Sequence, residues 1–147
     1  MRTLLLLGNV LVLILFPSRI LAQQHFPEEV GGSIRYNAQI ETPKGCVSGI
    51  CILLNDSTEI KGSFFNEFGI SAIDYSYLIK KEKIKLHHVM GFMNKWYIKK
   101  QLKKDLLCLM HNLRKETCQY KNDRYNITYS LTPMPADQQK SDYETTE

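Results

Sequence analysis

Hydrophobic and polar residues alternate through much of the first half of the chain, which predicts β-strands. From Ser33 to Glu41 every second residue is apolar, the period of an antiparallel strand with one buried face. Similar runs bounded by turn residues predict four more strands. These cover Val47–Leu54, Glu59–Phe65, Ile70–Ile79 and a run in which Ile84, Leu86, His88 and Met90 face inward and Lys85 and His87 outward. Together the five runs predict an antiparallel meander.

After Gly91 the apolar residues recur at steps of three and four, which predicts a helix of about six turns that stops near Lys115. We expect its apolar stripe to lie on the sheet as the main cover of the core. The stripe consists of Phe92, Trp96, Ile98, Leu102, Leu106, Leu109, Met110 and Leu113.

A last alternating run completes the predicted domain. Tyr125, Ile127, Tyr129 and Leu131 share one face of a strand that closes the sheet. The acidic segment from residue 133 to 147 has no apolar period and is expected to be disordered. The sequence therefore predicts one α+β domain over residues 23–132, with an antiparallel curved sheet of about six to seven strands covered by one long amphipathic helix.

The first 22 residues have the pattern of a secretory signal peptide. Arg2 precedes an apolar run from Leu4 to Phe16, and small residues lead to Ala22. We expect cleavage near Ala22 and a periplasmic or secreted product. Because no cysteine stands directly after the apolar run, where a bacterial lipoprotein carries its lipid, we expect a soluble product without a lipid anchor.

The charge of the chain is unevenly distributed. Of its 147 residues, 19 are Lys or Arg and 15 are Asp or Glu; loss of Arg2 and Arg19 leaves 17 basic residues and a net charge of +2. Such a balance does not favour nucleic acid as a partner. The segment from Lys80 to Lys104, however, has nine lysines and one acid. Its helical part is either an ordinary solvated face or a docking surface, made of Lys95, Lys99, Lys100, Lys103 and Lys104.

The four cysteines leave two alternatives open. Export would permit disulfides, but buried free thiols are equally compatible with the sequence. Cys46 and Cys51, five residues apart on a strand, would point to opposite faces.

The sequence has no recognisable catalytic motif. It lacks a nucleophile elbow, a glycine-rich phosphate loop and a Cys-x-x-Cys pair. Cys108 and His111 share a helix face, but without a second pair we favour a buried cysteine and a capping histidine over zinc. Asp105 is expected to accept a hydrogen bond from Gln101, one turn earlier. We therefore predict a non-enzymatic protein with no cofactor or metal.

Two sequons, Asn55-Asp-Ser and Asn126-Ile-Thr, would be glycosylation sites in a eukaryotic secretory pathway. Chance occurrence is the alternative, and we favour it because Asn126 is expected within a strand.

Two stretches carry a resemblance to a known family. Ile60 to Ala72, with the loop at Phe68-Gly69, and Asn94 to Lys100 resemble small exported proteins of Bacteroidota-type bacteria and, more loosely, the outer-membrane lipoprotein carrier and receptor (LolA/LolB-like) superfamily. The resemblance implies an incomplete, half-barrel-like sheet whose apolar concavity holds acyl chains. It also implies ligand-binding roles for Phe64, Phe68, Ile70 and Trp96, although such aromatics also fill ordinary cores.

Two functions follow as hypotheses. The first is a carrier of an acyl chain or lipoprotein in the cell envelope. The alternative is an interaction module that docks an acidic protein or an anionic membrane surface through the Lys80–Lys104 block.

Overall fold

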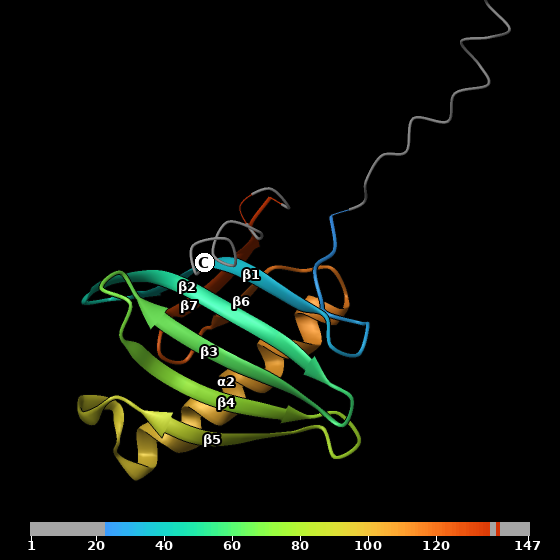
Figure 1. Cartoon of the computed structure of the whole chain (residues 1–147). Helices are drawn as coiled ribbons and strands as arrows, with labels where there is room; N and C mark the ends of the chain where they lie inside the picture. The colour runs from blue at the N-terminus through green and yellow to red at the C-terminus, as the bar shows by residue number, and fades with distance from the viewer. Residues whose placement is uncertain (1–22, 136–137, 139–147) are drawn as a thin grey trace, which may run out of the picture.

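The computed structural model describes residues 23–135 and 138, which form an antiparallel sheet and one helix (Figure 1). The predicted signal peptide and most of the predicted tail lie outside the described residues. The strands are β1 (Ser33–Thr42), β2 (Gly45–Asp56), β3 (Glu59–Asn66), β4 (Ser71–Leu78), β5 (Lys83–Val89), β6 (Gln119–Asn122) and β7 (Ile127–Pro133). A short 3-10 turn, η1 (Gly91–Met93), precedes the helix α2 (Trp96–Arg114).

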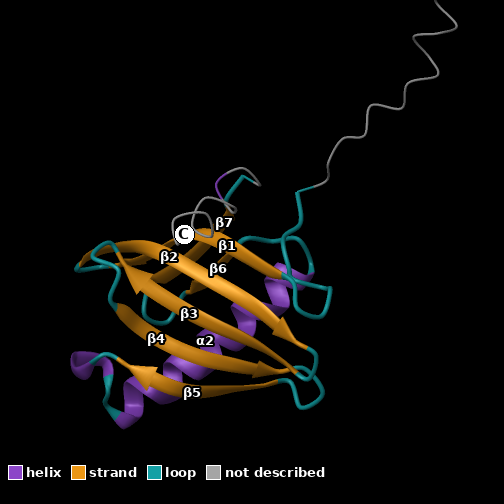
Figure 2. Cartoon of the chain, in the orientation of Figure 1, coloured by secondary structure: helices purple, strands orange, loops and turns teal. Residues whose placement is uncertain are grey.

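The sheet is curled and has seven strands in the order β5-β4-β3-β2-β1-β7-β6. The first five form the predicted meander, and β7 returns to pair with β1. Figure 2 shows α2 crossing one side of this sheet. The prediction of an α+β fold with a half-barrel-like antiparallel sheet and one helix is thus confirmed. The strand β6, of only four residues, was not predicted.

The C-terminal two thirds of α2 supplies the helical part of the core. The buried residues there are Leu102, Asp105, Leu106, Leu109, Met110 and Leu113. The prediction that Phe92 and Trp96 also lie on the sheet is wrong, because their side chains are 68% and 74% exposed. Phe92 belongs to η1 and Trp96 is the first residue of α2, so both precede the buried part of the helix, which starts at Leu102.

A β-bulge changes the inward face of β5. Asp74 pairs with His88 but Tyr75 pairs with Leu86, so His87 is the extra residue on the edge strand. The prediction that His88 faces inward is therefore wrong: His88 is exposed and Val89 is buried. Ile84 is buried as expected, and Leu86 packs partly on the core.

The first residues of the predicted tail lie among the described residues. Pro133 belongs to β7, and the backbone N–H of Met134 donates to Arg35 O at 2.8 Å. Backbone pairing thus extends to Met134, and the prediction of disorder for the rest of the segment concerns residues that are mostly outside the described part of the chain.

All four cysteines are free thiols in the structure, and they differ in environment. Cys46 is exposed on β2, whereas Cys51 is buried in the core. Burial raises the pKa of the Cys51 thiol to about 12.

The two sequons also differ. Asn55 is buried, and its side-chain amide donates to Pro27 O at 2.9 Å and Glu28 O at 3.0 Å. The expectation that Asn126 lies within a strand is wrong, because it is exposed in the turn before β7 with a φ of 51°. Of the two sequon asparagines, only Asn126 has an accessible side chain in the folded protein.

Candidate functional site

A pocket of about 340 Å³ opens between the sheet and the first half of α2. It exists because the helix leaves the sheet toward its N-terminal end, so that apolar residues of both layers face each other without filling the space. The strands supply Ile40, Thr42, Ile73, Ile127 and Tyr129; η1 and α2 supply Met93, Tyr97, Ile98, Gln101, Leu102 and Asp105; and the β6–β7 turn supplies Tyr125.

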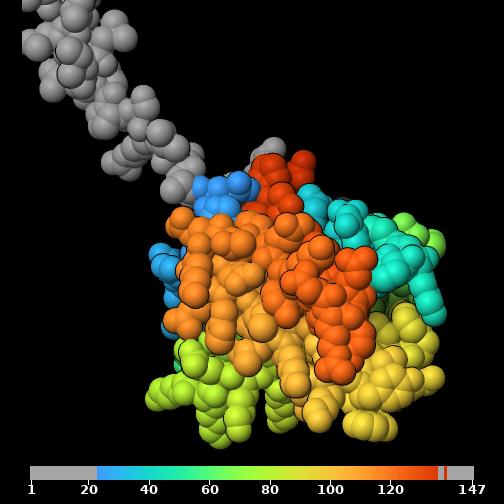
Figure 3. All heavy atoms as spheres, turned by 180° about the vertical axis from the view of Figure 1, so that it is seen from behind, coloured from blue at the N-terminus to red at the C-terminus, as the bar shows by residue number. Residues whose placement is uncertain are grey.

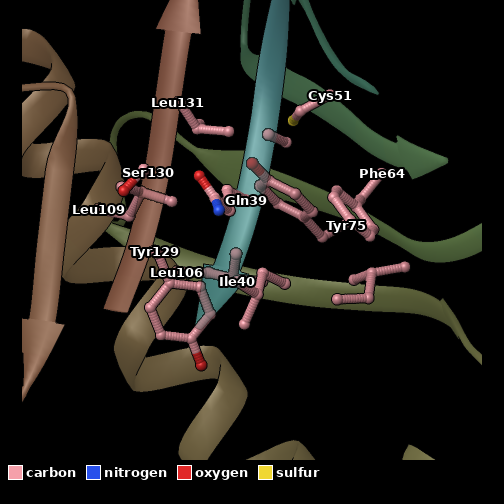
Figure 4. A pocket seen from close by; sticks show the side chains of 12 residues that line it. Gln39, Ile40, Cys51, Phe64, Tyr75, Leu106, Leu109, Tyr129, Ser130 and Leu131 are labelled. Atoms are coloured by element: carbon pink, nitrogen blue, oxygen red, sulfur yellow. The ribbon is translucent and has the colours of Figure 1, made fainter. Parts of the chain in front are cut away.

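A second, much smaller cavity of about 30 Å³ lies deeper between the layers (Figure 4). Its apolar walls include Phe64, Tyr75, Leu106 and Leu131. Ile40, Ile73 and Tyr129 line both spaces. These three side chains, which we call the partition, therefore stand between the open pocket and the small cavity.

The residues expected to bind a ligand do not come together around the pocket. Phe64 is buried and lines only the small cavity. Phe68, Ile70 and Trp96 are 77%, 56% and 74% exposed and lie outside both linings. The alternation of β1 and β7 did indicate Ile40, Ile127 and Tyr129 as inward-facing. Nothing in the sequence indicated that Met93, Tyr97 and Ile98 would line an open space.

A fully buried carboxylate stands at the inner wall of the pocket. Asp105 Oδ1 accepts hydrogen bonds from Gln101 Nε2 at 2.8 Å and Asn122 Nδ2 at 2.9 Å, and Oδ2 accepts one from Tyr129 Oη at 2.8 Å. The bond from Gln101 was predicted; the other two, from β6 and β7, were not. Three donors to an ionised acceptor stabilise a charge that burial alone would disfavour. The network therefore fastens α2 to the far edge of the sheet.

The same network fixes the state of Tyr129. Burial, together with the negative charge of Asp105, raises the pKa of the Tyr129 hydroxyl far above its usual value. The hydroxyl therefore stays protonated at neutral pH and donates to the carboxylate, which holds the Tyr129 ring in the partition.

The fold divides the basic block that is continuous in the sequence. Lys80, Lys81 and Lys83 lie at the β4–β5 turn, whereas Lys95 lies at the start of α2, at the other end of β5. In the view from behind, the two segments occupy opposite ends of the face (Figure 3). The helical lysines form a separate group in which Lys95, Lys100, Lys103 and Lys104 are exposed and Lys99 is half-buried.

Within residues 23–135, no group of three or more His, Cys, Asp or Glu side chains is placed to hold a metal ion. In the same part of the chain, no helix is long and apolar enough to cross a membrane.

Comparison with known proteins adds no relative: no family model, no curated protein and no solved structure matches the chain. The resemblance to lipoprotein carriers therefore stays a prediction.

Proposed function

We propose that the protein is a non-enzymatic carrier that holds an apolar ligand, such as an acyl chain, in the pocket beneath α2. The observation that carries this proposal is the open pocket itself. Its volume of about 340 Å³ falls within the usual range for small-molecule sites, and its walls are mostly apolar. In this proposal α2 acts as a long amphipathic cover, and the protein works in the cell envelope or outside the cell.

The polar groups around the pocket set the direction in which a ligand would enter. Asp105 lies at the inner wall and carries a negative charge without an ion-pair partner among the described residues. A carboxylate or phosphate head group is therefore disfavoured there. An acyl chain would enter tail first, and its head group would remain outside, close to the lysines at the start of α2.

Filling the pocket should weaken ligand binding. We expect Ile98→Trp to reduce the affinity for a fluorescent fatty acid at least roughly tenfold, because a larger side chain would occupy space that the ligand needs. Fluorescence titration measures the affinity, and native mass spectrometry of the gently purified protein would detect a retained lipid.

Ile50→Trp provides the matched control, since Ile50 is exposed and lies outside the lining of the pocket. It should leave the affinity unchanged. A protein that carries no lipid and binds no fluorescent fatty acid would contradict the carrier proposal, as would equal losses in the two variants.

The helical lysines favour a second candidate function, the docking of an acidic protein. The five residues from Lys95 to Lys104 form no ion pair within the described part of the chain. Four of them are exposed, so their charges are available to a partner.

For this candidate we expect salt-sensitive binding to polyglutamate that is abolished by changing Lys99, Lys100, Lys103 and Lys104 to Glu. Equilibrium titration at low and high salt measures it. The matched control changes Lys80, Lys81, Lys83 and Lys85 to Glu, an equal change in net charge elsewhere. Equal losses would mean that only net charge matters and would reject a specific helical surface.

A further inference from the structure

Exposed apolar side chains gather at one end of the molecule. Among the described residues, half of the ten large hydrophobic side chains that are exposed belong to the β3–β4 turn, η1 and the first residues of α2. We call this group the aromatic end, and it consists of Phe68, Ile70, Phe92, Trp96 and Tyr97.

The antiparallel pairing brings these segments together. The β3–β4 turn adjoins the end of β5, where Met90 N donates to Ala72 O at 2.8 Å, and η1 follows directly. Figure 1 shows the β3–β4 turn and η1 at the same end of the sheet. The rings of Trp96 and Tyr97 are 5.9 Å apart in an edge-to-face arrangement. Side chains from the β3–β4 turn, η1 and the start of α2 thus expose apolar surface at one end of the sheet, and they stay exposed in the part of the chain that the structure describes.

This surface is also basic. Lys95, Lys99 and Lys100 stand at the start of α2, whose first turn contains no acidic residue. The positive end of the helix dipole adds to their field. Glu67, in the β3–β4 turn, places one exposed acid at the same end of the sheet. Trp96 and Lys100 lie four residues apart, so aromatic and basic side chains share one helix face.

The open pocket reaches the same end. Tyr97 belongs both to the aromatic end and to the lining of the pocket, and Met93 of η1 also lines it. A surface that covered the aromatic end would therefore lie beside the mouth through which a ligand enters.

We propose that the aromatic end docks on an anionic lipid bilayer, with its aromatic rings at the boundary between head groups and acyl chains and with Lys95, Lys99 and Lys100 on lipid phosphates. Exposed aromatics interleaved with lysines suit this interface. The rings can enter the apolar boundary of the acyl chains while the neighbouring lysines contact the anionic head groups. An acidic protein would account for the lysines but not for the rings. The orientation of the pocket toward the membrane rests on the proposed carrier function, whereas the docking itself does not.

The single tryptophan of the chain, Trp96, reports on this contact directly. With vesicles of phosphatidylglycerol and phosphatidylcholine, we expect a blue shift of its emission and quenching by brominated acyl chains. With phosphatidylcholine alone, we expect little binding. High salt should weaken binding to the mixed vesicles.

Two variants test the two parts of the surface. Changing Lys95, Lys99 and Lys100 to Glu should weaken binding to the mixed vesicles roughly a hundredfold or more, since each lysine near an anionic surface contributes on the order of a fivefold gain. Changing Phe68 and Phe92 to Ser, at exposed positions, should reduce both vesicle binding and quenching of Trp96. Circular dichroism verifies that both variants are folded.

The controls lie away from the aromatic end. Changing Lys80, Lys81 and Lys83 to Glu alters the net charge equally, and Val30→Ser removes another exposed apolar side chain. Both should bind vesicles as the unchanged protein does. Absence of vesicle binding, equal losses in the two lysine variants, or binding only to polyglutamate would overturn the proposal. Titration with fluorescent fatty acid in the absence of vesicles tests the pocket separately, so failure of docking and failure of the carrier function are distinguishable.

Discussion

Replacing Asp105 by alanine is expected to lower the free energy of unfolding by roughly 3 to 5 kcal/mol. The change leaves the buried donors of Asn122 and Tyr129 without an acceptor, and hydrogen bonds to a charged group are each worth about 1.5 to 3 kcal/mol. Relief of the cost of burying the charge offsets part of the loss. Because a domain has only about 5 to 15 kcal/mol in total, urea unfolding followed by circular dichroism would show the effect clearly.

Two further variants separate the contributions. Asp105→Asn keeps the shape and one acceptor oxygen, so it should cost less than alanine. Gln101→Ala should cost about 1 kcal/mol or less, since Gln101 is only half-buried and water can replace its amide. A loss below about 1 kcal/mol for Asp105→Ala would show that the network does not hold α2 on the sheet.

Alkaline pH should unfold the protein over a narrow interval. Burial raises the pKa of Cys51 to about 12 and the pKa values of Tyr36, Tyr75 and Tyr129 well above the usual value of 10.0. In the unfolded chain these groups lose their protons near pH 9 for the thiol and pH 10 for the phenols, whereas the folded chain retains them. Above these values the unfolded state therefore binds fewer protons, and stability falls as pH rises.

The expected slope is steep because four groups act together. Each contributes about 1.4 kcal/mol per pH unit, so above pH 10 the sum is about 5.5 kcal/mol per unit. The loss reaches about 7 kcal/mol by pH 11 and about 12 kcal/mol by pH 12, so a typical domain would unfold in or near this interval. Urea unfolding between pH 7 and 11.5 measures the slope, and absorbance at 295 nm should show the tyrosinates of the core appearing only as the protein unfolds.

Tyr36→Phe tests the assignment of this effect to buried hydroxyls. Tyr36 Oη donates to His25 O at 2.8 Å, so the variant loses one hydrogen bond but also one ionisable group. Its slope above pH 10 should be shallower by about 1.4 kcal/mol per unit. A free energy of unfolding that stays constant up to pH 11 would contradict the role given to these residues.

Much of the sheet could be predicted from the sequence because each strand carries its own period. Ile34, Tyr36 and Ala38, for example, are apolar at every second position, and all three are buried. The bulge at His87 could not be predicted, because no residue type marks the extra residue. That residue reverses which side chains face inward in the rest of the strand. The strand β6 escaped because four residues are too few to establish a period.

The site was less predictable than the fold because it depends on where the layers separate. The recurrence of apolar residues every three or four positions correctly predicted that Leu102 and Leu106 are buried. The same recurrence includes Phe92 and Trp96, which are exposed. Periodicity identifies a face of a helix, not the point along the helix at which that face stops being buried. The network around Asp105 could not be predicted either, since Asn122 and Tyr129 are distant in sequence and meet the carboxylate only when β6 and β7 pair.

In the proposed carrier, the partition would make binding depend on the length of the apolar ligand. A short apolar chain would fit the open pocket without rearrangement, whereas a longer one that went deeper would pass Ile40, Ile73 and Tyr129 toward the small cavity. Tyr129 is fastened by its hydrogen bond to Asp105, so the two isoleucines are the side chains free to change rotamer. Selectivity would then depend on the number of methylene groups in the ligand and not on the chemistry of its head group.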